Sequence, residues 1–410
     1  MKISYVEIDN YRSIKSQCFD VKDVLAFVGR NNSGKSNFLK AISLFFYPST
    51  RDLGWEIFNK HDTSDRIRIR VKFTGLNAWE QSELQPWMIG DDFIMERHFE
   101  EVEENQYSVK TFAVVSLPEV EWLREDAVSG IKISDWWSDR NNLFVSGFDF
   151  SDYLGATKPS VGKWKECVAA FLREHGATVP HSEVLIENPK GYAGVLKGCL
   201  PNFIYVPAVR SVEEEAKVNK SNPFGQLVNA VIGQVSDENR GALNSALSTV
   251  SSLLNRGGEE RIQTIQGFED RLNRLMTEVF ECEVEVEVEV PELEDVMKKT
   301  TLVVNDGWRT SIDEKGSGLQ RSMIFTILRA YAELKQEQAE DERGGKSIII
   351  AIEEPEIYLH PQQQADFYRT INNLASGSDQ VFYTTHSPLF LEVARFDQIC
   401  MVRKGGGGWL

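Results

Sequence analysis

The sequence lacks the features that would place the chain in or across a membrane. No apolar run among its 410 residues approaches the roughly 18 residues of a membrane helix. The first ten residues, MKISYVEIDN, alternate as a charged strand and do not form the apolar centre of a signal peptide. We therefore expect a cytoplasmic protein without a membrane partner.

Cysteine and positive charge are both scarce. The five cysteines are scattered and form no C-x-x-C pair, which favours reduced thiols over a disulfide framework. Lysine and arginine number 45 against 62 acidic residues, which gives a net charge of −17. A protein that coats nucleic acid over its whole surface is usually basic, so any contact with double-stranded DNA must use a local patch.

One short stretch has the pattern of a phosphate-binding loop. GRNNSGKS follows the apolar run VLAFV and precedes an amphipathic helix expected at roughly 36–46. Its glycines allow a tight turn whose backbone N–H groups point at phosphates, and the helix adds its N-terminal dipole. Lys35 can reach the β- and γ-phosphates, and the Ser36 hydroxyl can bind Mg²⁺. A chance match would lack this strand and helix. The residues that we expect to contact ATP in this segment are Gly29, Asn31, Asn32, Ser33, Gly34, Lys35, Ser36 and Asn37.

A second apolar strand ends in two carboxylates. Within KSIIIAIEEPEIYLHP, the run from Ile348 to Ile352 is typical of a strand buried on both faces of a parallel sheet. Ligands of α/β proteins bind at the carboxyl ends of such strands, so Glu353 and Glu354 are expected beside the phosphate loop. One carboxylate can hold Mg²⁺ through water, and the next can orient the attacking water. A helix start or surface turn is the less favoured interpretation.

Two further segments contain candidate phosphate contacts. QVFYTTHSP is another buried strand, and it ends at His386, a candidate for contact with the γ-phosphate. A lone histidine is more often structural, but this one accompanies the two motifs above. KGSGLQ is a glycine–serine turn before an apolar helix, whose first N–H groups form a second anion site.

Two strands with charged faces leave alternatives open. In DRIRIRVKF, Arg66, Arg68, Arg70 and Lys72 share one face, which either contacts a DNA backbone or pairs with neighbouring carboxylates. In ECEVEVEVEVP, residues 281–291, glutamates alternate with valines. We predict a strand with a solvated acidic face, and the basic strand could pair with Glu283–Glu289 in one antiparallel sheet.

The middle of the chain contains fewer interpretable patterns. Residues 75–200 alternate strand-like pieces with aromatic loops, in which Trp136 and Trp137 form either a small core or a partner surface. From about 211 to 280 the apolar spacing of three and four indicates two long amphipathic helices. Their apolar faces need a partner, which is either the domain itself or a second copy.

Together these motifs carry a family resemblance. GRNNSGKS, GSGLQR, IIIAIEEPEIYLHP and TTHSP resemble an ABC-type ATPase head of the RecF/SMC kind. The EEPE-x-x-LHP form and NYRSIK at 10–15 are similar to the OLD (overcoming lysogenization defect) family and its anti-phage relatives of the Gabija, Septu and PARIS type. The resemblance implies an α/β fold with a mixed and parallel sheet, flanking helices, an antiparallel β lobe and an inserted helical dimerisation region. The implied parts are residues 1–210 with the phosphate loop, 211–280 for dimerisation, and 281–410 with the signature, carboxylate strand and histidine.

The resemblance also implies roles for single residues. Lys35 and Ser36 bind phosphate and Mg²⁺, and Glu353 takes the position where other carboxylate strands have aspartate. Glu354 is the catalytic base and His386 the switch histidine.

Four further positions are assigned by the resemblance alone. Ser317 and Gly318 belong to a signature loop that contacts ATP on a second subunit, although the segment reads GSGLQ and not SGGQ. Arg12 lies near the nucleotide, and His360 lies in a segment that lines the dimer interface.

The implied function is an ATPase that forms a homodimer or higher oligomer around ATP and regulates a DNA nuclease in anti-phage defence. After the switch-histidine strand the sequence stops at GGGGWL, without a Toprim glutamate or a D-x-D cluster. We therefore expect the nuclease in a missing C-terminal domain or a partner protein, and not in this chain. The alternatives are an ATP-switched scaffold that holds an effector and a RecF-like DNA repair ATPase.

Overall fold

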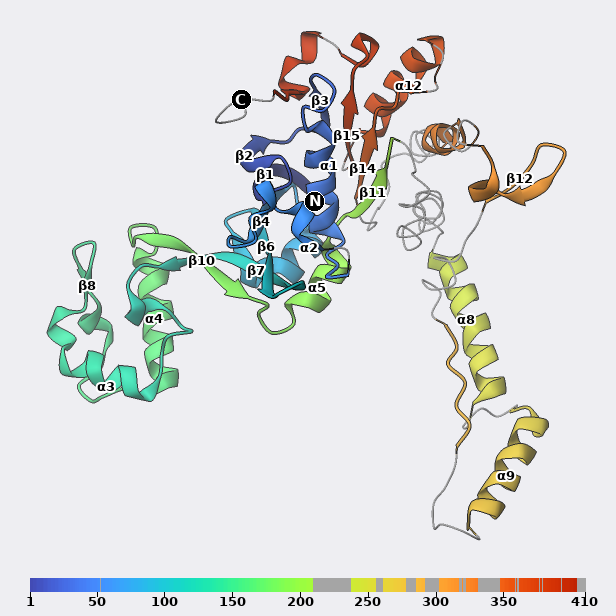
Figure 1. Ribbon diagram of the computed structural model, residues 1–410. Coiled ribbons are helices and arrows are strands. Elements are labelled where there is room, and N and C mark those ends of the chain that lie inside the picture. The colour runs from blue at the N-terminus through green and yellow to red at the C-terminus, as the bar shows by residue number, and fades with distance from the viewer. Residues whose placement is uncertain are drawn as a thin grey trace. The chain divides into compact units, whose positions relative to one another are not determined.

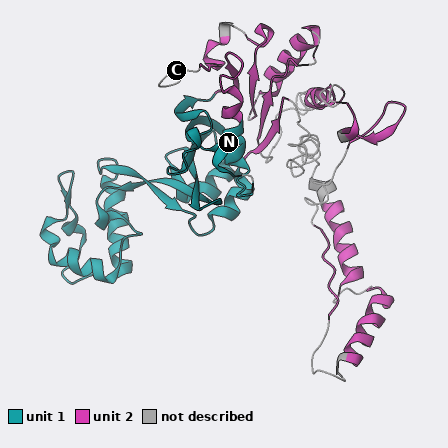
Figure 2. Cartoon of the chain, in the orientation of Figure 1, with its two compact units in different colours: residues 1–21, 40–200, 405–409 teal, residues 22–39, 201–404, 410 magenta. Residues whose placement is uncertain are grey.

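The computed structural model divides the chain into two compact units (Figure 2). Unit 1 contains Met1–Val21 and Lys40–Leu200, and unit 2 contains Lys22–Leu39 and the described part of Pro201–Lys404. The structure describes residues 1–51, 53–208, 237–255, 261–277, 285–291, 302–316, 319, 322–330, 347–357, 359, 361–375, 377, 379–391 and 393–403.

Unit 1 is built on an antiparallel sheet. Within the described residues seven strands form it, in the order β10-β7-β6-β4-β1-β2, with β5 paired to β6. The strands are β1 (Lys2–Tyr11), β2 (Ile14–Asp20), β4 (Ile67–Thr74), β5 (Met88–Ile89), β6 (Asp92–Glu103), β7 (Gln106–Pro118) and β10 (His181–Glu187). Helices α2 (Ala78–Leu84) and α5 (Tyr192–Cys199) contact each other in the same unit.

Strand β4 follows the alternation of its sequence. Its burial alternates residue by residue, with Ile67, Ile69, Val71 and Phe73 fully buried. Apolar side chains at every second position face one side of a sheet, so the basic side chains lie on the other side. The predicted half-buried strand with a basic face is confirmed.

Residues 119–180 form a small aromatic core of their own in unit 1. The secondary structure there is α3 (Gly130–Ser138), α4 (Val161–His175), β8 (Phe144–Val145) and β9 (Phe148–Asp149). Trp164 is fully buried, and its indole N–H donates to the carbonyl of Trp122 at 2.9 Å. Trp136 stacks against Trp164 with ring centroids 5.3 Å apart. Trp136 is therefore part of this core.

Unit 2 contains a parallel sheet. Its strands, in the order β11-β14-β15-β3-β16, are β11 (Asn202–Val206), β14 (Ile348–Glu353), β15 (Gln380–Thr385), β3 (Val24–Val28) and β16 (Ile399–Met401) (Figure 1). Every residue of β3, β14 and β15 is buried. Uninterrupted apolar strands of this kind belong to parallel sheets covered on both faces. Helix α1 (Lys35–Phe46) follows β3, and α12 (Pro361–Leu374) packs against β15.

Two successive helices and short elements complete unit 2. Helix α8 spans Asp237–Leu254 and helix α9 spans Gln263–Thr277, and between them the Ile262 N–H donates to the Leu253 carbonyl of α8. Strands β12 (Val303–Asn305) and β13 (Arg309–Ser311) form a two-stranded ribbon. Residues 322–330 are helical.

The acidic segment differs from the prediction. Residues 285–291 keep the alternation of exposed glutamates and half-buried valines, but they carry no strand assignment. Two of their amides bond to side chains instead: Val286 donates to Glu269 on α9, and Val288 donates to Asn255, the residue after α8. The described part of the segment therefore does not pair with the basic strand β4.

Short 3₁₀ helices link the main elements. In unit 1 they are Trp55–Ile57, Asn59–His61, Gln85–Trp87, Glu121–Leu123, Arg140–Asn142 and Phe150–Tyr153. In unit 2 they are Ile312–Glu314, Pro388–Phe390 and Val393–Gln398. No described helix is long and apolar enough to cross a membrane.

The architecture confirms the predicted fold class. A parallel sheet with a phosphate loop after β3 is combined with an antiparallel β lobe. The compact units divide the chain differently from the predicted parts, because β3 pairs with β15 and β16 and so joins the C-terminal strands. The functional division at 210 and 280 stays a prediction.

Candidate nucleotide site

The phosphate loop is a close-packed turn at the end of β3. A Cβ on Gly29 would lie 2.2 Å from the backbone oxygen of Val402, so only glycine fits there. Gly34 has φ 99°, a left-handed conformation that glycine adopts without strain. The turn is closed by bonds from the Ser33 N–H to the Arg30 carbonyl and from the Asn37 N–H to the Gly34 carbonyl.

Lys35 connects the loop to the predicted histidine. Its ammonium lies 3.2 Å from both the Gly29 and Arg30 carbonyls and 2.7 Å from His386 Nε2. An ammonium can only donate, so in this contact Nε2 accepts and the ring proton lies on Nδ1, whereas a hydrogen bond to a phosphate oxygen would need a proton on Nε2. Burial lowers the pKa of Lys35, while the charges of Glu354 and Glu356 act in the opposite direction. Two residues 351 positions apart in the sequence thus meet directly.

Glu354 sits in a strained backbone conformation. Its φ is 45°, in the left-handed region that costs a non-glycine residue about 1–3 kcal/mol. The conformation is held by the Glu354 N–H, which lies 3.0 Å from both the carbonyl and the hydroxyl oxygen of Thr384. The carboxylate Oε1 lies 3.5 Å from His386 Nε2. The strained turn therefore directs this carboxylate toward the histidine and lysine.

Glu353 has the properties of a ligand to a cation. The side chain is buried, and Oε2 accepts a hydrogen bond from the Ala208 N–H at 3.1 Å. Oε1 is buried and has no hydrogen-bond partner among the described residues. A buried carboxylate oxygen without a donor fits a water of a bound Mg²⁺. No group of three or more acidic, histidine or cysteine side chains in the described part of the chain could hold a metal, so Ser36, Glu353 and nucleotide phosphates would share the ion.

Other predicted contacts are less well defined. Asn31 and Asn32 are exposed in the loop, and Asn32 has φ 57°. Arg12 lies in the turn between β1 and β2 of unit 1, where its N–H donates to the Ile57 carbonyl at 2.7 Å. Its role near a nucleotide stays a prediction, as do those of Ser317, Gly318 and His360, which lie outside the described residues.

Several residues near the site had no predicted role. Thr384 supports the strained backbone of Glu354. Glu356 accepts a hydrogen bond from the His386 N–H, and Gln364 accepts one from the Ser387 hydroxyl. The last glutamate of the EEPE string, Glu356, is the one signal in the sequence for this group, because it follows the predicted carboxylate pair by two positions.

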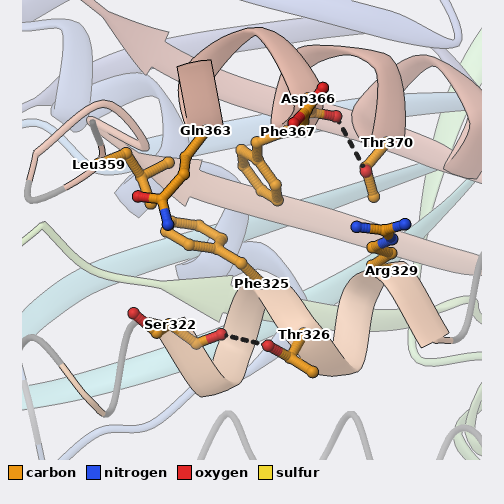
Figure 3. Close-up of a pocket in the computed structure, with 9 residues that line it drawn as sticks. All are labelled: Ser322, Phe325, Thr326, Arg329, Leu359, Gln363, Asp366, Phe367 and Thr370. Atoms are coloured by element: carbon orange, nitrogen blue, oxygen red, sulfur yellow. Dashed lines mark hydrogen bonds between the residues drawn. The ribbon is translucent and has the colours of Figure 1, made fainter. Parts of the chain in front are cut away.

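A separate cavity lies between helix 322–330 and α12 (Figure 3). Its volume is about 190 Å³, and the rings of Phe325 and Phe367 meet in it with centroids 4.1 Å apart. Its lining also includes Leu359 and Gln363. None of the predicted nucleotide contacts that the structure describes lines this cavity, so it is distinct from the phosphate site.

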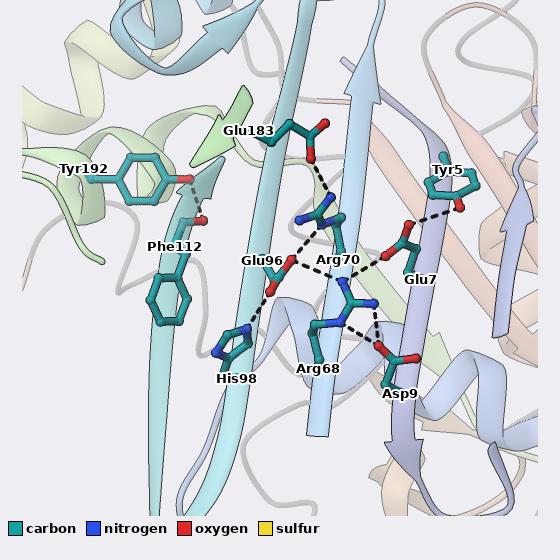
Figure 4. A network of polar contacts seen from close by, with 10 residues as sticks. All are labelled: Tyr5, Glu7, Asp9, Arg68, Arg70, Glu96, His98, Phe112, Glu183 and Tyr192. Carbon is teal, nitrogen blue, oxygen red and sulfur yellow. Dashed lines mark hydrogen bonds and ion pairs between the residues drawn. The ribbon is translucent and has the colours of Figure 1, made fainter. Parts of the chain in front are cut away.

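The basic face of β4 is occupied by carboxylates of its own sheet (Figure 4). Arg68 contacts Asp9 at 2.5 Å and Glu7 at 2.9 Å, both on β1. Arg70 contacts Glu96 on β6 at 2.6 Å and Glu183 on β10 at 2.8 Å. These contacts agree with the alternative that the basic face pairs with neighbouring carboxylates, which here come from β1, β6 and β10. Of the predicted partners Glu283–Glu289, Glu283 lies outside the described residues.

Glu96 is the buried centre of this network. Its side chain is 1% exposed and lies 2.5 Å from His98 Nε2. Burial raises the pKa of a carboxyl group, but the hydrogen bonds from His98 and Arg70 and the charges of Arg70 and Arg68 outweigh burial and lower the pKa of Glu96 to about 2. The carboxylate stays charged inside the sheet because three cationic or donor groups surround it.

Reversing Arg68 and Arg70 to glutamate should destabilise the fold. The change would leave Glu96 buried without its cations and place like charges beside it, and breaking a buried pair costs about 3–5 kcal/mol. A melting curve should show a lower transition temperature for unit 1, with ATP binding intact. The matched control is Arg66→Glu and Lys110→Glu, two charges at more solvated positions of the same sheet. An unchanged melting curve with a weaker, less salt-dependent affinity for duplex DNA would instead support the DNA contact.

An arrangement of this kind, with a phosphate loop, strand-end carboxylates and a histidine at one edge of a parallel sheet, defines a P-loop nucleoside triphosphatase. The chain belongs to the AAA ATPase domain family, whose model matches residues 1–391. This membership supports ATPase activity and nucleotide binding.

Relatives of this chain carry the names of nucleases. The Old nuclease of Escherichia phage P2 is 23% identical over 415 residues, which cover 100% of this chain and 60% of that protein. The endonuclease GajA of Bacillus cereus is 22% identical over 399 residues, which cover 95% of this chain and 56% of that protein. The OLD nuclease of Thermus scotoductus is 41% identical over 93 residues, 22% of this chain and 16% of that protein. The predicted relationship to the OLD family is confirmed, and the chain spans about 60% of the length of the relatives that it matches from end to end.

Solved structures of SMC heads also match. A head bound to the C-winged helix domain of ScpA is 11% identical with a TM-score of 0.40, and the match covers 100% of this chain and 96% of that one. The SMC head domain from Thermotoga maritima is 10% identical with a TM-score of 0.32 and coverages of 98% and 94%. The fold assignment rests on the strand order described above.

Proposed function

We propose that this chain is a cytoplasmic ATPase that dimerises around ATP and regulates a DNA nuclease in anti-phage defence. The observation that carries the proposal is the convergence of Lys35, Glu354 and His386 around one point, with Nε2 of His386 within 3.5 Å of both partners. A cation, a carboxylate and an imidazole at the end of a parallel strand are suited to holding a terminal phosphate and a water in line.

Each residue has one task in the proposed reaction. The loop amides and Lys35 bind the phosphates, and His386 binds the γ-phosphate through the imidazole that now contacts Lys35. Glu354 orients the attacking water and accepts its proton, because its carboxylate emerges from the strained turn toward the histidine. Mg²⁺, when bound, would neutralise charge on the phosphates, with Ser36 and Glu353 as the residues that hold it.

ATP turnover, measured with and without duplex DNA, tests the enzymatic part. We expect the purified chain to release phosphate in the presence of Mg²⁺. A chain that binds ATP but shows no turnover under either condition would favour the scaffold alternative. The nuclease is proposed to lie in further polypeptide or in a partner protein, because the relatives named as nucleases are longer than this chain. The full reading frame and its neighbours would identify it.

Exposed apolar side chains on α8 and α9 support the proposed dimer. Phe268 and Leu275 on α9 are 56% and 55% exposed and stand seven residues apart, so they share one helix face. Leu243 and Val250 on α8 repeat this spacing and are also exposed. Large apolar side chains in a row on a surface mark interaction sites. We propose that α8 and α9 of a second copy cover them.

Introducing charge on this face should abolish the dimer. The test uses a Glu354→Gln background, which should retain ATP. Phe268→Glu combined with Leu275→Glu places two charges in a contact that must exclude water. Light scattering should then give the mass of a monomer. The control, Gln263→Glu with Gln266→Glu, adds the same charge to the polar side of α9 and should remain dimeric with ATP. A dimer that survives the apolar-face change would disprove this interface.

A further inference from the structure

We propose that Glu356 is the positioning residue of the ATPase site: it fixes the main chain of His386 and so aims the imidazole at Lys35 and Glu354. The proposal rests on the function proposed above. It concerns a residue two positions beyond the catalytic pair, to which neither the motif nor the family match gives a role.

The contact itself is short and specific. Glu356 Oε1 accepts the backbone N–H of His386 at 2.5 Å. A hydrogen bond to an ionised carboxylate is shorter and about twice as strong as a neutral one. The other oxygen, Oε2, is buried and has no hydrogen-bond partner among the described residues. The carboxylate thus makes its one described bond to the histidine backbone.

A second side chain holds the same two segments together. Gln364 on α12 donates from Nε2 to the carbonyl of Leu359 at 3.0 Å and to that of Glu356 at 3.4 Å. Its Oε1 accepts from the Ser387 hydroxyl at 3.0 Å. Glu356 and Gln364 therefore tie the turn after β14 to the segment after β15 at two successive residues, His386 and Ser387.

This connection matters because the turn also carries the proposed base. The Ile357 N–H donates to the Glu354 carbonyl at 3.1 Å, so Glu354 and Glu356 belong to one hydrogen-bonded turn. The Glu354 N–H in turn bonds to Thr384 on β15. A histidine held by Glu356 and a base held by Thr384 keep a fixed separation. Fixed geometry of this kind lowers the entropic part of a barrier, and a shift of about 1 Å can cost about a hundredfold in rate.

A double-mutant cycle in ATP turnover tests the proposal. Glu356→Ala should lower kcat by about tenfold to about a hundredfold with a smaller change in KM, because the orientation of His386 is lost while the phosphate loop stays intact. In a His386→Ala background the same change should have little further effect, because Glu356 acts through the histidine. Glu356→Gln keeps an oxygen acceptor for the N–H and should restore most of kcat. Asp366→Ala, which removes an exposed carboxylate of α12, is the matched control.

Two results in this assay would overturn the proposal. Equal loss in Glu356→Gln and Glu356→Ala would mean that the charge itself acts, as a base or a ligand. If the fold losses of kcat from Glu356→Ala and His386→Ala multiply in the double variant, the two residues act independently.

A spectroscopic measurement keeps the test independent of turnover. The chain has six histidines, so a ¹³C-histidine spectrum is simple, and His386→Ala identifies the resonance of interest. Glu356→Ala should shift or broaden that resonance and leave in place those of the four histidines in unit 1, His61, His98, His175 and His181. If the His386 resonance does not move, the positioning role is refuted, even in a protein that hydrolyses no ATP. If the resonance moves but the protein shows no turnover, the result counts only against the proposed function.

Discussion

Glutamine in place of Glu354 should leave ATP bound while turnover falls by about a hundredfold or more. The substitution keeps the size of the side chain and removes the carboxylate that we propose to orient and deprotonate water. The turn itself should persist, because its strained backbone is held by main-chain bonds to Thr384, which do not involve the carboxylate. Phosphate release and equilibrium ATP binding, measured on the same protein, separate the two effects.

The matched control for this result is Glu314→Gln. Glu314 is an exposed carboxylate of the same unit, and its loss should leave the rate unchanged. If Glu354→Gln hydrolyses ATP as fast as the parent, another group is the base, and Glu356 becomes the first candidate because its charge also acts on Lys35.

Removal of the Lys35 side chain should instead weaken ATP binding. A hydrogen bond to a charged group contributes about 1.5–3 kcal/mol, which corresponds to about tenfold to about a hundredfold in affinity. Lys35→Ala also leaves the Gly29 and Arg30 carbonyls and His386 Nε2 without their common donor. We expect calorimetric titration with ATP to show the loss. Lys40→Ala on the same helix is the control and should bind ATP as the parent does. Equal affinities of the two variants would contradict the assignment of Lys35.

The sequence allowed the nucleotide-binding strands to be predicted because their signals are local. Three strands, Val24–Val28, Ile348–Glu353 and Gln380–Thr385, are rich in apolar residues and are followed by a glycine loop, a second carboxylate and a histidine, respectively. The position of each chemical group at a strand end then follows from parallel pairing alone.

Features that depend on register and side-chain direction could not be predicted. The carboxylates that meet Arg68 and Arg70 come from β1, β6 and β10, and their identity depends on how the five strands from β10 to β1 align. The bond between Glu356 and the His386 amide likewise needs the exact path of two turns. The acidic segment alternates as a strand should, yet two of its amides bond to the side chains of Glu269 and Asn255, so its periodicity alone did not decide its pairing.

The position of β3 also has a consequence for protein synthesis. This strand is made early, but its two neighbours in the sheet, β15 and β16, are translated hundreds of residues later: Val24 pairs with Val381, and Ala26 pairs with Ile399. Closing so long a loop makes such pairing slow compared with local contacts. On the ribosome the phosphate loop therefore emerges long before the histidine and the carboxylates. We therefore expect the proposed ATPase site to assemble only after β16 has left the exit tunnel, so that the loop cannot act on ATP while the strands that complete its sheet are still being made.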